Sequence, residues 1–112
     1  MNTVKSGQYR WLVFKEDDSW IGVVLEFNIV ITGEDPKLVQ FELHEAALGY
    51  IESTAKMTKG FRQEQVSNLL NQKTEKEYEI RWTTAMQRRS IKKTADKIPS
   101  PFYSAGVSPI VV

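Results

Sequence analysis

The sequence contains no cysteine, which excludes disulfide bonds, thiolate zinc sites and cysteine nucleophiles. It has no apolar run of membrane-spanning length, and its polar first eight residues lack the apolar segment of a secretion signal. The absence of cysteine suits a reducing compartment. Together, these features predict a cytoplasmic protein without membrane contact.

The chain also has few of the residues from which catalytic sites are built. His44 is the only histidine, and it falls on the flank of a predicted helix beside Phe41, Leu48 and Ile51. The glycines follow no phosphate-loop spacing, so no nucleotide site is predicted. We therefore predict no catalytic residue, no cofactor-binding residue and no metal ligand.

What is present is the composition of an ordinary folded domain. The 112 residues are 41% hydrophobic and 26% charged, which predicts a single domain over residues 1–112. Residues 1–60 carry six basic and nine acidic residues, whereas residues 61–112 carry nine basic and five acidic ones. Any contact with a phosphate backbone is therefore expected in the second half.

Three strands are predicted near the N-terminus. Apolar and aromatic runs favour strands over Tyr9–Phe14, Trp20–Phe27 and Ile29–Thr32, with a polar turn over Glu16–Ser19. Gly22 is a candidate bulge or a point of close approach. The order and the turns predict a small antiparallel sheet.

A long amphipathic helix follows the sheet. Asp35 is placed to cap its N-terminus, Pro36 suits its first position, and it is predicted to reach about Lys59, with Gly60 closing it. One broad face should cover the sheet. That face consists of Val39, Leu43, Ala46, Ala47, Tyr50, Ile51 and Met57.

The second half of the chain carries weaker signals. Gln63–Leu70 is predicted as a short helix, and residues 75–88 fit either a helix or a strand. Thr74 and Glu77 have the spacing of a capping box, which favours the helix and leaves Ile80 out of phase. Residues 98–112 contain three prolines and many apolar residues, which predicts an extended tail that packs on something. The predicted class is α+β, with a β-β-β-α core, shorter helices over residues 61–97 and this tail.

Several features of residues 9–58 occur together in one known family. Asp18 and Trp20 are similar to an Asp-Gly-aromatic hairpin, the segment 33–35 is similar to a Gly-Asp-Thr approach to a helix, and the helix has an Ala-rich face around Ala46. In these respects the segment resembles the N-terminal domain of HicB-like antitoxins. The resemblance implies a partial ribonuclease H fold with one further strand, used as an inactive scaffold.

The sequence also departs from that family. Residues 25–30 replace its Pro-Asp-Leu-Pro-Gly-Cys segment, and residues 61–112 show neither a ribbon-helix-helix nor a helix-turn-helix pattern. The expected function is a non-enzymatic protein-binding module, antitoxin-like, with a small ribonuclease toxin as partner. Any distinctive function is expected in residues 25–30 and in the basic second half.

Two alternatives remain at this point. The basic residues after Trp82 could bind RNA or DNA, or an acidic protein face; they are Arg88, Arg89, Lys92, Lys93 and Lys97. Glu16, Asp17, Asp18 and Glu26 could hold Mg²⁺ in a divergent nuclease, although a solvated acidic turn explains them better.

The number of strands raises the question of self-association. A three-stranded sheet has two open edges and one uncovered face, and the chain is rich in aromatic residues. A homodimer is one solution, and coverage by residues 98–112 is the other.

Overall fold

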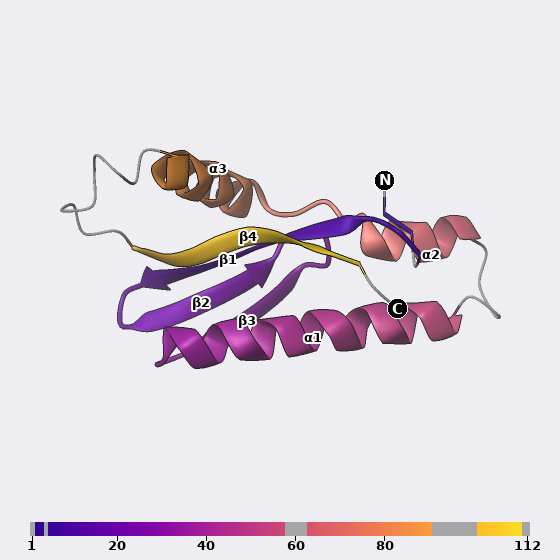
Figure 1. Ribbon diagram of the computed structural model, residues 1–112, viewed down its shortest axis with the longest axis horizontal. Coiled ribbons are helices and arrows are strands. Elements are labelled where there is room, and N and C mark those ends of the chain that lie inside the picture. The colour runs from indigo at the N-terminus through magenta and orange to yellow at the C-terminus, as the bar shows by residue number, and fades with distance from the viewer. Residues whose placement is uncertain (1, 4, 58–62, 91–100, 111–112) are drawn as a thin grey trace.

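The chain forms a four-stranded sheet with one long helix on one face and a shorter helix on the other (Figure 1). The computed structural model describes residues 2–3, 5–57, 63–90 and 101–110, except for the side chains of residues 63 and 88–90. The elements are β1 (Gln8–Glu16), β2 (Ser19–Val24), β3 (Ile29–Gly33), α1 (Pro36–Lys56), α2 (Gln63–Leu70), α3 (Lys76–Ser90) and β4 (Phe102–Pro109). This arrangement confirms the predicted α+β class.

The strands lie in the order β3-β2-β1-β4, and every neighbouring pair is antiparallel. The apolar C-terminal segment supplies β4, which pairs with β1 so that Trp11 lies opposite Gly106. The extended conformation and the packing predicted for this segment are confirmed over Phe102–Pro109. It covers one of the two edges that the first three strands leave open.

The second strand is shorter than predicted. It ends at Val24, and the following residues, Leu25 to Asn28, form a turn in which Asn28 has a positive φ of 53°. Leu25 and Phe27 are nevertheless buried, because the turn directs both apolar side chains into the core. The apolar sequence was therefore a correct signal for burial and a wrong one for the strand's end.

Helix α1 begins as predicted. The Asp35 carboxylate accepts a hydrogen bond from the Lys37 N–H at 3.0 Å, and Pro36 occupies the first turn. A Cβ at Gly22 or at Gly33 would lie 2.9 Å from a Val39 methyl, so the two glycines let α1 approach β2 and β3 closely. The helix ends at Lys56, and Lys59 and Gly60 lie outside the described residues.

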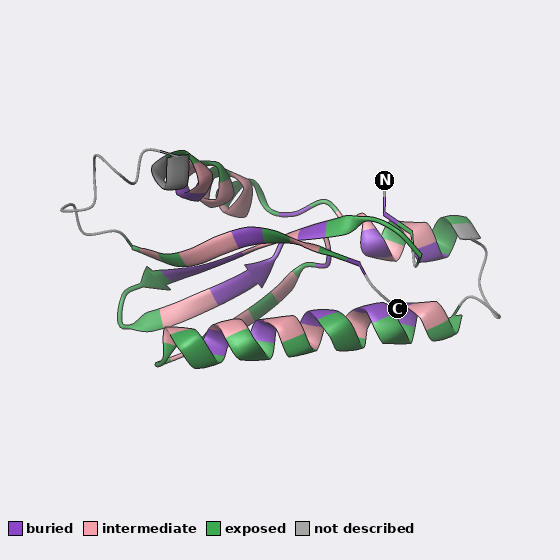
Figure 2. Cartoon of the chain, viewed as in Figure 1, coloured by how far each residue is buried: buried purple, intermediate pink, exposed green. Residues whose placement is uncertain are grey.

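Each face of the sheet has its own core (Figure 2). Under α1, the buried residues include Val13, Val24, Val39, Leu43, Ala47 and Ile51. On the α3 face they are Leu12, Phe14, Val23 and Leu25, with Tyr78 and Trp82 packed against them. Met57, which was predicted on the buried face of α1, is exposed because it lies at the end of the helix.

The two short helices occur where the helical interpretation placed them, over Gln63–Leu70 and Lys76–Ser90, and Ile80 is exposed on α3. The capping box is wrong. The Glu75 carbonyl accepts the first backbone hydrogen bonds of α3, and the buried Thr74 hydroxyl has no hydrogen-bond partner in the structure. None of the helices in the described segments is long and apolar enough to cross a membrane.

Candidate interaction surface

Arg10 on β1 joins α3 to the sheet. Its Nε donates to Glu26 Oε2 at 2.6 Å, and its two terminal nitrogens donate to Glu79 on α3 at 2.7 and 2.8 Å. The Glu26 carboxylate also accepts the Arg10 backbone N–H at 2.7 Å, and the Arg10 guanidinium lies 5.8 Å from the centre of the Trp82 ring. Each of the three guanidinium nitrogens of Arg10 therefore donates to a carboxylate, either that of Glu26 or that of Glu79 on α3.

The electrostatics of this network are those of a structural contact. The hydrogen bond from Arg10 holds the pKa of Glu79 below its ordinary value, and the two carboxylates raise the pKa of Arg10. Both groups therefore stay charged across the neutral pH range, and neither is poised to transfer a proton. The sequence did not reveal this network, because Arg10 is 16 residues from Glu26 and 69 residues from Glu79.

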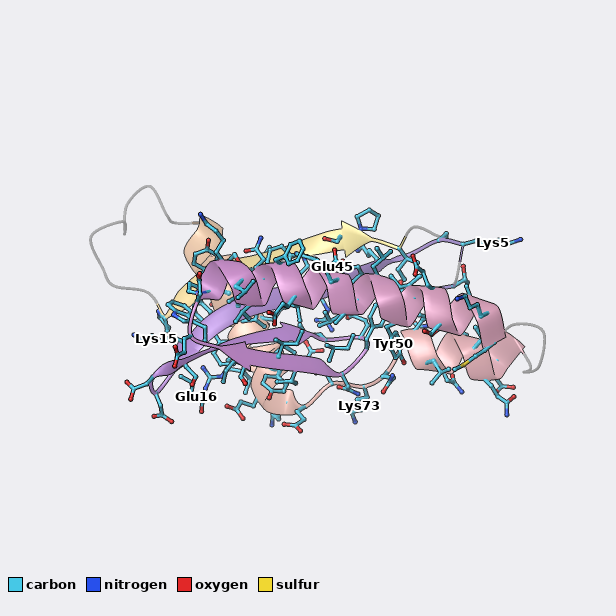
Figure 3. The ribbon with its side chains drawn as sticks, turned by 90° about the horizontal axis from the view of Figure 1, so that it is seen from below. Lys5, Lys15, Glu16, Glu45, Tyr50 and Lys73 are labelled. Carbon is cyan, nitrogen blue, oxygen red and sulfur yellow. The ribbon has the colours of Figure 1, made fainter. Side chains whose placement is uncertain are left out.

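The acidic hairpin between β1 and β2 has the features of a solvated turn. Asp17 adopts a positive φ of 55° within the turn, and Glu16 lies 3.6 Å from the Arg81 guanidinium of α3. Figure 3 shows Glu16 at the hairpin end of the sheet, far from Lys5 at the other end. Within the described segments, no three acidic or histidine side chains gather in a way that could hold a metal ion.

On the face of the sheet that α1 covers, His44 of α1 contacts aromatic residues of β1. His44 Nδ1 lies 3.2 Å from the Tyr9 hydroxyl, and the Trp11 ring meets the imidazole edge to face at 4.7 Å. Trp11 Nε1 donates to Ser108 Oγ on β4 at 3.1 Å. The partners of His44 come from β1, so the spacing of residues along the helix could not show them.

This aromatic cluster is neutral. Burial lowers the pKa of His44 below its ordinary value, so the imidazole is uncharged at pH 7, and burial raises the pKa of Tyr9. A neutral imidazole that contacts a protonated phenol and an indole offers packing and hydrogen bonding. The cluster contains no anionic nucleophile and no cation at neutral pH.

Two large, exposed apolar side chains lie on the same flank of α1 as His44. Phe41 is 61% exposed and Leu48 is 45% exposed, and they lie three residues before and four residues after His44, on the same flank of α1. The Ser104 hydroxyl of β4 donates to Gln40 Oε1 at 2.6 Å, which places this flank of α1 beside β4.

Tyr103 of β4 is a further exposed side chain, next along the strand to Ser104. Its ring is 43% exposed and packs edge to face on Trp20, whose side chain lies on the α1 face of the sheet. We refer to Phe41, His44, Leu48 and Tyr103 as the α1–β4 surface. Figure 3 shows α1 lying lengthwise over the sheet with β4, in yellow, along one side of it.

The predicted basic residues are only partly placed. Arg88 and Arg89 lie in the last turn of α3, and their side chains are not among those described. Lys92, Lys93 and Lys97 lie outside the described residues. The structure therefore brings none of the five into a described site.

Comparisons of the chain with models of known protein families, with curated proteins and with solved structures found no match.

Proposed function

We propose that the protein is a non-enzymatic protein-binding module that holds its partner through the α1–β4 surface. The observation that carries this proposal is the grouping of exposed apolar side chains around a neutral aromatic cluster, with Phe41 61% exposed at its edge. Exposed aromatic and aliphatic residues that lie together typically mark protein–protein contacts. Contact between apolar side chains and water is unfavourable, so a complex that buries them gains free energy.

The partner class that we propose is a small ribonuclease toxin, so that the module acts like an antitoxin. Two features support this class. Residues 9–58 resemble the HicB-like N-terminal domain, for which the resemblance implies a strand–strand–strand–helix unit with one further strand, and this chain has that element order and a fourth strand, β4. On the α3 face, the charged side chains of Arg10, Glu26 and Glu79 bind one another and attach α3 to the sheet, whereas the α1–β4 surface combines exposed apolar side chains with an aromatic cluster.

The test is co-expression with the product of the neighbouring gene, where that gene encodes a small protein with a double-stranded-RNA-binding-like fold. We expect a stable complex and suppression of RNA cleavage by the toxin. Phe41→Asp should weaken binding at least about tenfold, because an aromatic side chain that becomes buried in an interface commonly contributes this much. The affinity is measured by isothermal titration calorimetry and the inhibition by an RNA cleavage assay.

A matched control is available on the other side of the molecule. Ile80 is an exposed apolar residue of α3, so Ile80→Asp introduces the same charge without touching the α1–β4 surface. Its affinity should equal that of the wild type. Equal affinities for Phe41→Asp and the wild type would refute the assignment of the surface, and full toxin activity in the presence of excess protein would refute the antitoxin role.

A further inference from the structure

The outer edge of β3 carries backbone groups that point away from the sheet. In an antiparallel ladder, the residues of a strand bond alternately to the neighbours on its two sides. The Leu25 N–H donates to the Arg10 carbonyl at 3.0 Å, so this odd-numbered residue bonds to β1. Because the bonding alternates, the odd-numbered residues of β2 also bond to β1, and the even-numbered ones bond to β3. The β3 residues opposite them are Ile29, Ile31 and Gly33, so Val30 and Thr32 direct their N–H and C=O groups outward.

This edge lacks the features that usually prevent strand pairing. β3 contains no charged residue and no proline, and the Val30 side chain is 47% exposed. Among the described residues, none bonds to the outward groups of Val30 or Thr32. The chemistry that fits such an edge is another extended strand, whose own N–H and C=O groups would satisfy it.

The other edge is different. β4 departs from regular register beside Val13 and Phe14, and it ends in Pro109. A bulge and a proline are two devices by which edge strands avoid pairing. Of the two edges of this sheet, β3 is therefore the one open to a further strand.

We propose that β3 pairs with β3 of a second copy of the chain, antiparallel, about a two-fold axis at Ile31. Each Val30 then exchanges backbone hydrogen bonds with Thr32 of the partner subunit. Ile31 meets Ile31 of the partner subunit at the closer, non-hydrogen-bonded position, where β-branched pairs pack well. The two sheets become one continuous sheet of eight strands.

Two features make β3 compatible with pairing to β3 of a second copy. In this register Glu34 falls opposite the neutral Asn28 of the partner subunit, so no like charges face each other across the pair. Both α1 helices lie on the same side of the joined sheet, and the flank of α1 away from His44 carries Glu42 and the small residues Ala46, Gly49 and Ser53. A Cβ at Gly49 would meet nothing within 4 Å, so the surface of α1 is open at this position.

The first experiment compares two valines in matched positions on the two edges. Val30 on β3 and Val107 on β4 are 47% and 45% exposed, and both lie on the α3 face of the sheet. We expect sedimentation equilibrium to show a dimer for the wild-type chain. Val30→Lys should raise the dimer dissociation constant at least about tenfold, because each dimer would carry two lysines at the paired strands. Val107→Lys should leave it unchanged, and circular dichroism melting checks that both variants are folded.

The second experiment tests the register. Because the chain has no cysteine, Ile31→Cys introduces a single thiol, and facing residues of a non-hydrogen-bonded pair are close enough for a disulfide. This variant should form a covalent dimer under mild oxidation, whereas Val107→Cys should stay monomeric on a non-reducing gel. A monomeric wild-type chain, equal dissociation constants for the two lysine variants, selective dissociation of Val107→Lys, or no crosslink through Ile31→Cys would each overturn the proposal.

Discussion

Replacement of Arg10 by methionine should destabilise the protein more than replacement of any other charged side chain in the described segments. Methionine keeps the apolar stem of arginine and removes the guanidinium. The change leaves Glu26, whose side chain is only 18% exposed, without its 2.6 Å partner, and it releases Glu79 from two hydrogen bonds at 2.7 and 2.8 Å. The attachment of α3 to the sheet is weakened as a result.

The magnitude follows from the burial of the two carboxylates. A hydrogen bond to a charged group with partial burial contributes about 1.5–2 kcal/mol. The bond to the more exposed Glu79 is screened by solvent and adds about 0.5–1 kcal/mol. The expected loss is about 2–3 kcal/mol, which corresponds to a fall in Tm of about 10 °C for a chain of this length.

The assay is urea unfolding of the wild type, of Arg10→Met, of the carboxylate variants and of the double variants that combine them with Arg10→Met, followed by tryptophan fluorescence and by circular dichroism. Double-mutant cycles with Glu26→Gln and Glu79→Gln should give the larger coupling energy for Glu26. Glu77→Gln serves as the control, because Glu77 forms an exposed pair with Arg81 at 3.1 Å and its loss should cost about 0.5 kcal/mol or less. If Arg10→Met unfolds at the urea concentration of the Glu77 variant, the network does not hold α3 in place.

Three further changes have defined outcomes. Gly106→Ala would place a Cβ 2.9 Å from the Trp11 ring, so it should cost about 1–2 kcal/mol in urea unfolding; an unchanged midpoint would contradict the close packing. The lowered pKa of His44 means that the unfolded chain takes up the proton first, so stability should fall as the pH drops below about 6.5, and this loss should disappear in His44→Gln when both are melted between pH 7.5 and 5. Thr74→Val removes a buried hydroxyl without a partner and should raise the unfolding free energy by about 1 kcal/mol, whereas a loss of stability would show that the hydroxyl is satisfied.

The parts of the fold that the sequence predicted are those with local signals. Asp35 and Pro36 mark the start of α1, and apolar spacing located the first three strands and the helix Gln63–Leu70. For residues 75–88 the same spacing fitted both a helix and a strand, and the capping box that favoured the helix is not formed. The pairing of β4 with β1 had no such signal, because Trp11 and Gly106 lie 95 positions apart. Only the apolar character of the tail could be read, and the strand that it joins could not.

The candidate surface was less predictable, and for the same physical reason. Phe41 and Leu48 were read beside His44 from helical spacing, but the Tyr9 and Trp11 partners of His44 come from β1. The apparent capping box failed because Thr74 and Glu77 match a spacing that many segments contain by chance, while the carbonyl of Glu75 starts the helix. Spacing shows which residues share an element, and the packing between elements shows what those residues contact.

The position of β4 at the end of the described chain has a consequence for biosynthesis. Every other described element is made before it, so during translation β1 has one neighbour, β2, and an open side until the last strand leaves the ribosome. At about 5–20 residues per second, the interval between the end of β1 and the end of β4 lasts on the order of 5–20 s. Contacts between such distant residues also form slowly, because a long loop must close first. The nascent chain therefore exposes the free edge of β1 (Gln8–Glu16) to other chains during that time, and slower translation would lengthen the interval.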